Sequence, residues 1–558
     1  MRACTARILG LCALASPVAG SYIGSMSPGA KQMFTESMNW MDNYYDADAG
    51  YLYDFSAGTA LRHETRSSVW YALGLLARNE GTDAAEAEKI IKNTISGQYT
   101  VESEEWFGNY QQEPEEPYVG SPAYPATIYG SWDPNWRGFI GTTLIIAMEE
   151  FPHLLAKDTQ KLILASLHKA TLGDSYRFGH LDKALDNLYP AYSNPSIMRA
   201  FASGWTGRRL GETNMTAAGE KYAQEVIDLF NEQNTLSEFN SGTYTGVSLF
   251  GLILWSKYLP KDSVMTKNGP RMIKFTWEAV SELWHPGLKN MAGPWDRSYG
   301  YDMNRYLSLM ALWFWPLIGK DQAGLISKPQ VMSHAADYAW APVFAVLADK
   351  HKSLIPKNIL KSLSKFGGEH TFTTSTRSPP FDNSPRYFTT WLSDKITIGA
   401  ESFDEIVVGG PARSPESFNP AVIQWDTGSE ISFISESRER NADVQCPQLY
   451  PTEMALDVKV NPWNLTLSYP YGNSSSIFTL VVGTFANKRT ISGWEDVQGL
   501  DVTVSGNVNE AYELSFGGSY GGSNEPIRDF EYWNFTYSMP PGFTGVPTAV
   551  LDVQLLEN

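Results

Sequence analysis

The pattern of apolar residues changes once along this chain, near residue 365, and this change limits the possible folds more than any other feature. Before it, apolar side chains recur at three- and four-residue spacing, which is typical of helices. After Phe366-Gly367-Gly368 the apolar runs become short, alternating or β-branched, and turns rich in Gly, Asn, Pro and Ser separate them, which predicts strands. A chain with its helices before its strands forms separate helical and β parts, because an α/β fold alternates the two.

The helical spacing is distinct in seven segments, and turn signals such as Asn194-Pro195 and Gly269-Pro270 separate segments of this kind. The segments are Glu64–Arg78, Asp83–Ile95, Ile140–Phe151, Asp158–Leu172, Thr213–Asn231, Tyr244–Lys257 and Asp302–Ile318. We estimate about eleven to twelve helices in all. Because no strand or repeat motif interrupts them, the helices are predicted to pair as hairpins and close a ring, an α/α toroid, over residues 25–365.

The predicted strands are short and follow one another at regular spacing. They are Phe372–Ser375, Tyr387–Leu392, Lys395–Ile398, Ala421–Trp425, Glu430–Ser435, Ala455–Val460, Leu465–Tyr469, Ile477–Val482, Leu500–Val504 and Ala549–Leu555. Such strands are typical of an antiparallel β-sandwich, which we predict for residues 366–558. Two domains also suit a chain of 558 residues, since one hydrophobic core rarely serves that length.

The N-terminal residues have the parts of a secretory signal peptide, predicted to span residues 1–20. Arg2 and Arg7 precede the apolar run Ile8–Ala15, and small residues then offer a cleavage site before Ser21. Beyond this segment Cys446 is the only cysteine, so no internal disulfide is expected. The chain is predicted to be secreted, and four sequons are compatible with glycosylation: Asn214, Asn464, Asn473 and Asn534.

Charge and composition narrow the possible partners. The formal net charge of −18 argues against nucleic acid, which is bound by clustered Lys and Arg. No apolar run is long enough to cross a bilayer, and no metal-binding or nucleotide-binding motif appears, so we expect no membrane span, metal or cofactor. The 18 Trp, 29 Tyr and 26 Phe exceed what is ordinary, and aromatic rings line sugar and apolar-ligand clefts as well as cores.

Polar and aromatic residues gather in five loops of the helical part, mostly where a predicted helix begins. The clusters are His63–Arg66, Asp133–Gly138, Leu188–Pro195 with His180 upstream, Glu238–Tyr244, and Gly293–Asp302. In a ring of hairpins every second helix begins at the same end, so these loops are predicted to meet there, where helix N-termini favour an anion. Each cluster taken alone is also explained as a capped turn.

Residues of these loops suit proton removal next to a uronate carboxylate. This reaction requires Asn, His or Arg to neutralise the carboxylate, and Tyr or His to serve as base and acid. The predicted catalytic residues are Tyr299, Tyr244, His180 and Asn194. The predicted substrate-binding residues are His63, Arg66, Asn135, Trp136, Asn240, Trp295, Arg297, Tyr301 and Asp302.

The chain resembles the α/α-toroid polysaccharide lyases. The resemblance lies in a helical toroid followed by an antiparallel β domain, in Asn135-Trp136 and Gly141 at a helix start, and in Tyr-rich loops. Glu238–Gly246 and Arg297-Ser298-Tyr299 are similar to loops of fungal toroid proteins near those lyases. The resemblance implies a secreted lyase that cleaves a uronate-containing polysaccharide by β-elimination, with a small-molecule or oligosaccharide substrate.

Two other enzyme classes fit the same residues. A toroid glycoside hydrolase would use paired carboxylates, for which Asp133, Glu238, Asp296 and Asp302 are candidates. A secondary-metabolite cyclase or dehydratase that folds a terpenoid or polyene would use an aromatic cavity, as the abundant Trp and Tyr permit. A binding protein without catalysis is the remaining possibility, and an apolar cleft without titrating groups would indicate it.

Overall fold

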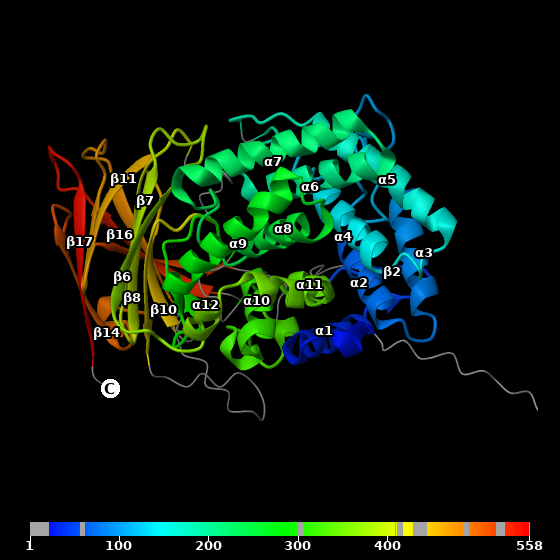
Figure 1. Ribbon diagram of the computed structural model, residues 1–558. Helices are drawn as coiled ribbons and strands as arrows, with labels where there is room; N and C mark the ends of the chain where they lie inside the picture. Colours follow the sequence, from blue (N-terminus) through cyan, green and yellow to red (C-terminus); the bar gives the residue numbers. More distant parts are fainter. Residues whose placement is uncertain are drawn as a thin grey trace, which may run out of the picture.

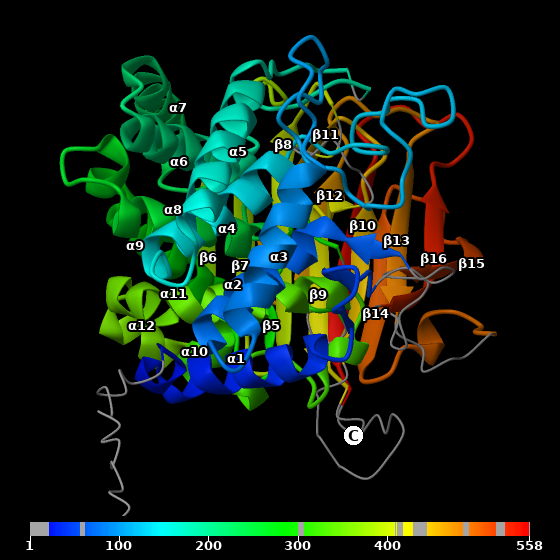
Figure 2. The same ribbon diagram turned by 90° about the vertical axis from the view of Figure 1, so that its right-hand side faces the viewer.

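The computed structural model describes residues 22–55, 62–182, 184–299, 306–407, 409, 417–427, 444–483, 490–520 and 530–556. Helices occupy one end of the molecule and strands the other (Figure 1). Viewed from the helical end, the helices lie in front of the strands (Figure 2). The predicted signal peptide and the predicted strand Glu430–Ser435 lie outside the described residues.

Six helices form an inner ring, and buried residues lie around most of the circumference of each one. They are α2 (Thr65–Arg78), α4 (Trp136–Glu150), α6 (Ser193–Leu210), α8 (Tyr244–Tyr258), α10 (Leu309–Ile318) and α11 (Ala341–Leu354). All of Tyr244–Trp255 and of Leu309–Pro316 is buried. A helix that is apolar all round must be enclosed by other elements. The order of packing is α2 on α4, α4 on α6, α6 on α8, α8 on α10 and α11, and α11 on α2, so the ring closes.

The remaining long helices pack outside this ring and bury only one face. They are α1 (Pro28–Met41), α3 (Asp83–Ser96), α5 (Lys157–Ser175), α7 (Thr213–Gln233) and α9 (Val264–Leu283). In α7 the buried residues are Met215, Gly219, Ala223, Val226, Ile227 and Phe230, a spacing that places them along one stripe. The predicted toroid of helical hairpins is therefore confirmed.

Two helix starts differ from the prediction. Asp302–Ile318 was expected to be one helix, but α10 begins at Leu309, because the Ser308 side chain accepts a hydrogen bond from Ala311 N and caps the helix there. Residues 302–305 lie outside the described part of the chain. The cluster Leu188–Pro195 was expected to be a loop, yet α6 already begins at Ser193, since Pro195 is compatible with the first turn of a helix.

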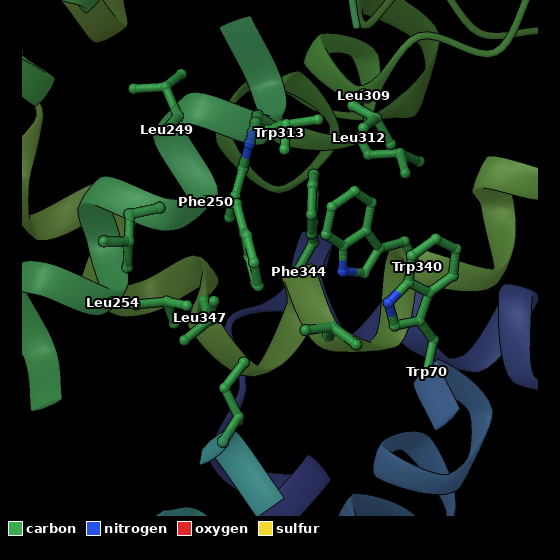
Figure 3. Close-up of a cluster of buried hydrophobic side chains, with 14 of the residues drawn as sticks. Trp70, Leu249, Phe250, Leu254, Leu309, Leu312, Trp313, Trp340, Phe344 and Leu347 are labelled. Carbon is green, nitrogen blue, oxygen red and sulfur yellow. The ribbon is translucent and has the colours of Figure 1, made fainter. Parts of the chain in front are cut away.

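Aromatic side chains fill the centre of the ring (Figure 3). Trp70 and Trp340 stack with ring centroids 4.6 Å apart, and Trp313 stacks on Phe344 at 4.1 Å. Phe250 meets Trp340 edge to face at 5.0 Å. These contacts join α2, α8, α10 and α11 in one core, so the ring is packed rather than open along its axis.

The C-terminal part is an antiparallel β-sandwich. One layer has the order β6–β7–β8–β9–β10–β13–β16–β15 and the other has β11–β12–β17–β14. The end of β8 pairs with β11 and so joins the two layers, while apolar side chains of both layers share one core. The strands are β6 (His370–Thr376), β7 (Arg386–Leu392), β8 (Ile396–Asp404), β9 (Ala421–Asp426), β10 (Val444–Tyr450), β11 (Ala455–Asn461), β12 (Asn464–Ser468), β13 (Ile477–Gly483), β14 (Leu500–Gly506), β15 (Glu513–Tyr520), β16 (Phe530–Ser538) and β17 (Thr548–Leu555).

The transition from helices to strands lies between α12 (Lys357–Ser362) and β6, which begins at His370. The helical part also contains a small three-stranded sheet and a hairpin. The sheet has β1 (Tyr45–Asp46), β2 (Tyr51–Tyr53) and β3 (His63–Glu64), and the hairpin has β4 (Trp284–His285) and β5 (Asn290–Met291). Among the described residues no helix combines the length and hydropathy that a membrane span requires. The sequon residues Asn214 and Asn473 are exposed, whereas Asn464 and Asn534 are half-buried within strands.

Candidate active site

A cavity of about 360 Å³ lies where the inner helices begin, and residues from all five polar loops line it. We call it the toroid cavity. Its lining residues are Arg66, Trp70, Tyr129, Asp133, Asn135, Phe139, Asn187, Tyr192, Asn194, Thr243, Tyr244, Val247, Arg297, Tyr299, Leu309, Asp337 and Trp340. The predicted convergence of the loops is thus found in the structure.

Each of the six inner helices presents its N-terminus to this cavity. The lining includes the N-cap residues Asn135 and Trp340 of α4 and α11, and residues of the first turn of the other helices. These first-turn residues are Arg66 in α2, Asn194 in α6, Tyr244 in α8 and Leu309 in α10. The partial positive charges of these helix ends favour an anionic group in the cavity.

Arg66 places a guanidinium on one wall. It lies over the rings of Trp70 and Trp136, at 4.9 and 5.0 Å, and its Nη2 is 3.1 Å from Glu64 Oε1. Burial acts to lower the pKa of Arg66, but the nearby carboxylates, first Glu64 and then Asp337, raise it above its usual value. Its Nε is buried and has no hydrogen-bond partner among the described residues.

Arg297 and Glu238 form an ion pair on another wall. Arg297 Nη1 is 2.9 Å from Glu238 Oε1, and Glu238 Oε2 accepts hydrogen bonds from Asn194 N (2.9 Å) and Asn194 Nδ2 (2.8 Å). The guanidinium also lies 3.5 Å from the ring centroid of Tyr244. Arg297 Nε is also buried without a partner among the described residues, while the side chain as a whole is 13% exposed.

A second polar network fixes Asn135. Its Nδ2 donates to Tyr192 Oη at 3.1 Å, and its Oδ1 accepts from Arg177 Nη2 at 3.1 Å. Arg177 is held in turn by Asp186, with Nε 2.6 Å from Oδ2. The amide is therefore oriented by partners on two sides, which pre-organises the wall at the start of α4.

Two tyrosines lie side by side at the centre of the site. The rings of Tyr244 and Tyr299 meet edge to face at 5.2 Å. Tyr299 also stacks on His334, with centroids 4.7 Å apart and an 11° angle between the planes. Burial raises the pKa of Tyr299 well above its usual value and lowers the pKa of His334 to about 4, so both are neutral near pH 7.

Two carboxyl groups complete the lining. Burial raises the pKa of Asp337 to about 6, although Arg66 acts in the opposite direction. Burial also raises the pKa of Asp133, whose Oδ1 accepts a hydrogen bond from Asn135 N at 2.8 Å. Perturbed carboxyls in a cleft are common in enzyme active sites.

The structure brings six of the predicted site residues to the toroid cavity and places five elsewhere. The six are Arg66, Asn135, Asn194, Tyr244, Arg297 and Tyr299. Tyr301 and Asp302 lie outside the described residues.

Of the five, His63 binds Glu115 through Nδ1 and stacks on Tyr53 at 4.5 Å, and His180 is exposed on its loop. Trp136 lies beneath Arg66 as part of the core. Asn240 donates to Ala292 O and Pro294 O, both at 2.7 Å, and Trp295 donates to Met291 O at 3.1 Å. These side chains therefore have structural partners away from the cavity.

Several lining residues were not predicted. Tyr192 and Asn187 fall in or beside a cluster that was recognised, and Tyr129 lies in the aromatic stretch before Asp133. Asp337 and Trp340 come from a sixth segment, which precedes α11. An acid next to an aromatic just before an apolar helix was the available signal for that segment. Among the described residues no group of His, Cys, Asp and Glu has the arrangement to hold a metal ion.

Fold and site together define this protein as an α/α-toroid plus β-sandwich protein with a polar, aromatic cavity at the helix N-termini. A family model described as "Domain of unknown function (DUF8769)" matches residues 31–349, more than half of the chain, so the protein belongs to that family. A second model, "Domain of unknown function (DUF8770)", matches residues 368–554. No curated protein matches the chain.

Solved structures with a distant likeness are polysaccharide lyases. Heparinase III shares 10% identity at a TM-score of 0.48, with 97% of this chain and 87% of that chain covered. A mutant of the heparan sulfate lyase HepC from Pedobacter heparinus shares 11% identity at a TM-score of 0.37, with 95% of this chain and 83% of that chain covered. Chondroitin AC lyase from Streptomyces coelicolor A3 shares 10% identity at a TM-score of 0.42, with 96% of this chain and 80% of that chain covered.

Proposed function

We propose that the toroid cavity binds a uronate residue of a polysaccharide and that the protein cleaves the chain there by β-elimination. The observation that supports this most is the gathering of two arginines, three asparagines and four tyrosines on one cavity at six helix N-termini. An acidic protein binds a carboxylate when the cavity itself supplies the positive charge and the donors.

In this proposal Arg66, Arg297 and Asn135 neutralise the uronate carboxylate. The two arginines line the cavity, and the asparagine is held in place by Tyr192 and Arg177. Charge-assisted hydrogen bonds to the carboxylate lower the energy of the carbanion that forms when C5 loses its proton.

Tyr244 and Tyr299 then share the proton transfers. Tyr244 begins as a tyrosinate, which the Arg297 guanidinium against its ring stabilises, and it becomes neutral when it accepts the C5 proton. Tyr299, which burial keeps protonated, donates a proton to the leaving oxygen as the C4–O bond breaks and the C4–C5 double bond forms. Asn194 holds Glu238, which in turn positions Arg297.

The test is incubation of the full chain with glucuronan, alginate, pectic and gum polysaccharides while the absorbance of the new conjugated double bond is followed. We expect one of them to give the signal, and Tyr299→Phe and Tyr244→Phe to lower the rate about 10²- to 10⁴-fold. Tyr338→Phe is the matched control, since Tyr338 is buried and does not line the cavity. No absorbance change with any uronate polysaccharide would exclude the lyase.

A glycoside hydrolase is the second candidate, and the pair Asp133 and Asp337 favours it. Both carboxyls line the cavity and both have raised pKa values, as a general acid requires. Glu238 and Asp296, two other carboxylates considered from the sequence, are fully buried in ion pairs with Arg297 and Arg386. Release of reducing ends from neutral glycans without new absorbance, lost in Asp337→Asn, would establish the hydrolase instead.

The cyclase alternative has less support. A cavity that folds a terpenoid or polyene is lined mainly by apolar and aromatic surface. Here charged side chains, namely Arg66, Asp133, Arg297 and Asp337, lie on the walls between the aromatic rings. Conversion of a polyene in the presence of the protein, with no effect on any glycan, would reverse this preference.

A further inference from the structure

The loop that carries Arg297 and Tyr299 is bound to the β domain along most of its length. Three backbone hydrogen bonds tie it to the segment before β9: Trp295 N to Asn419 O (3.0 Å), Asn419 N to Trp295 O (2.9 Å) and Ser298 N to Ser417 O (2.7 Å). Thr390 Oγ1, on β7, donates to Gly293 O at 2.8 Å. A Cβ on Gly399 would lie 1.8 Å from Gly293 O, so the loop lies directly against the sheet.

Arg386, at the start of β7, binds this loop and a second segment of the toroid at once. Its Nη2 donates to Asp296 Oδ2 at 2.9 Å and to Ser237 O at 2.9 Å, and its Nη1 donates to Asp296 Oδ1. Asp296 completes the connection, because its Oδ2 accepts from Phe239 N at 3.1 Å and its own N donates to Phe239 O at 3.2 Å. One guanidinium therefore fixes the spacing of two segments that are far apart in the sequence.

These two segments lead directly into the ion pair on the cavity wall. Ser237 precedes Glu238, and Asp296 precedes Arg297. We infer that Arg386 of the β domain is a positioning residue for the toroid cavity: through Asp296 and Ser237 it sets the Arg297–Glu238 pair that faces the ligand. What this pair binds rests on the proposed function, whereas the positioning itself does not.

The surroundings of Arg386 make its hydrogen bonds to Asp296 and Ser237 hard to replace. Arg386, Asp296 and Glu401 are each 0% exposed, so water does not replace a lost hydrogen bond. Glu401 Oε2 lies 3.8 Å from Arg386 Nη1, whereas Asp296 accepts hydrogen bonds from both Nη atoms, so Asp296 is the direct partner of the guanidinium. A lysine at this position would retain the charge but lose the planar fork that reaches both segments.

Hydrogen exchange of the full chain without ligand tests the positioning. In Arg386→Lys we expect protection of amides in residues 293–299 and 237–240 to fall at least about tenfold more than protection of the slowest amides of α6. Thr390→Val, which removes only the bond to Gly293 O, is expected to lower protection in 293–299 by a smaller factor. Arg208→Met is the control, because the Arg208–Glu220 pair joins the C-terminal end of α6 to α7 and does not line the cavity.

Equal loss of protection in α6 and in 293–299 would mean that Arg386 only stabilises the fold, and it would overturn the inference. Unchanged protection of 293–299 in both Arg386→Lys and Thr390→Val would overturn it as well. On a uronate polysaccharide that the protein cleaves, Arg386→Lys is expected to lower kcat more than it changes KM. If no uronate polysaccharide is cleaved, the lyase proposal fails while the exchange result still decides the role of Arg386.

Discussion

Asp296 and Arg297 are neighbours in the chain, and each belongs to a buried ion pair, yet the two pairs lie in different surroundings. Asp296 meets Arg386 at the junction of the domains, where both side chains are 0% exposed. Arg297 meets Glu238 on the cavity wall, where the arginine side chain is 13% exposed and the glutamate 0%. We call these the junction pair and the cavity pair.

The difference indicates what each pair does. A sealed pair gains little net stability over apolar residues of similar shape, but removal of one partner leaves a buried charge and costs much more. A pair that is open on one side retains access to water and to a ligand. The junction pair therefore holds two segments together, and the cavity pair presents a cation that is partly exposed and lines the cavity.

The largest effect is expected from breaking the junction pair. Arg386→Met should lower the free energy of unfolding by about 3–5 kcal/mol, because Asp296 then stays buried without its cation. The double variant Arg386→Met/Asp296→Leu should recover most of that loss. Urea unfolding followed by tryptophan fluorescence measures both. A loss below about 1 kcal/mol in the single variant would show that the pair is no more than a surface-like contact.

Breaking the cavity pair should affect turnover more than stability. Arg297→Met is expected to lower the free energy of unfolding by about 1–3 kcal/mol, because water from the cavity partly solvates Glu238. The rate on a uronate polysaccharide should fall about 10²- to 10³-fold, since a donor to the developing negative charge is lost. Rate and urea stability are measured on the same preparation. A stability loss as large as that of Arg386→Met would remove the distinction between the two pairs.

Asp337, a carboxyl on the cavity wall, allows a test of how burial beside the cavity changes stability with pH. Because the pKa of Asp337 is about 6 in the folded state against an ordinary 3.8, the folded state binds the proton more tightly, and stability falls as pH rises through this window. Asp337→Asn should remove this dependence and raise the free energy of unfolding at pH 7 by about 1–3 kcal/mol, with no gain near pH 4. Asp262→Asn, at an exposed position, is the control. Parallel stability–pH curves for Asp337→Asn and the wild type would contradict the prediction.

The smallest effect is expected from a partly exposed pair. Arg208 at the end of α6 and Glu220 on α7, with side chains 27% and 24% exposed, lie 2.6 Å apart. Arg208→Met should change the free energy of unfolding by less than about 1 kcal/mol and leave the rate unchanged. A larger stability loss in the urea experiment would mean that the solvent exposure of an ion pair does not determine how much stability is lost when the pair is broken.

Much of the fold could be predicted because inner and outer helices and the strands each leave a periodic pattern in the sequence. The start of α6 was harder to recognise, since Asn194 and Pro195 have the composition of a turn and yet form its first helical turn. The start of α10 was placed too early, because Tyr306 and Leu307 continue the apolar run but belong to a bridge with Ser333.

The site could be predicted as a set of loops but not side chain by side chain. Asn240 and Trp295 lie in the recognised clusters, yet their side chains bind the backbone behind the cavity wall, which depends on the path of the chain. His63 pairs with Glu115 from a distant loop. Asp337 was missed because its segment has few polar residues, and its importance arises only when α11 closes against α2.

A closed ring of helices has a seam where the first and last members meet, and here the seam runs through the cavity. Arg66 stands on α2, Asp337 stands just before α11, and Trp70 and Trp340 stack between these two helices. A ligand that contacts both sides therefore links the beginning of the toroid to its end. At a concentration one hundred times its Kd, such a ligand would raise the free energy of unfolding by about 2.7 kcal/mol.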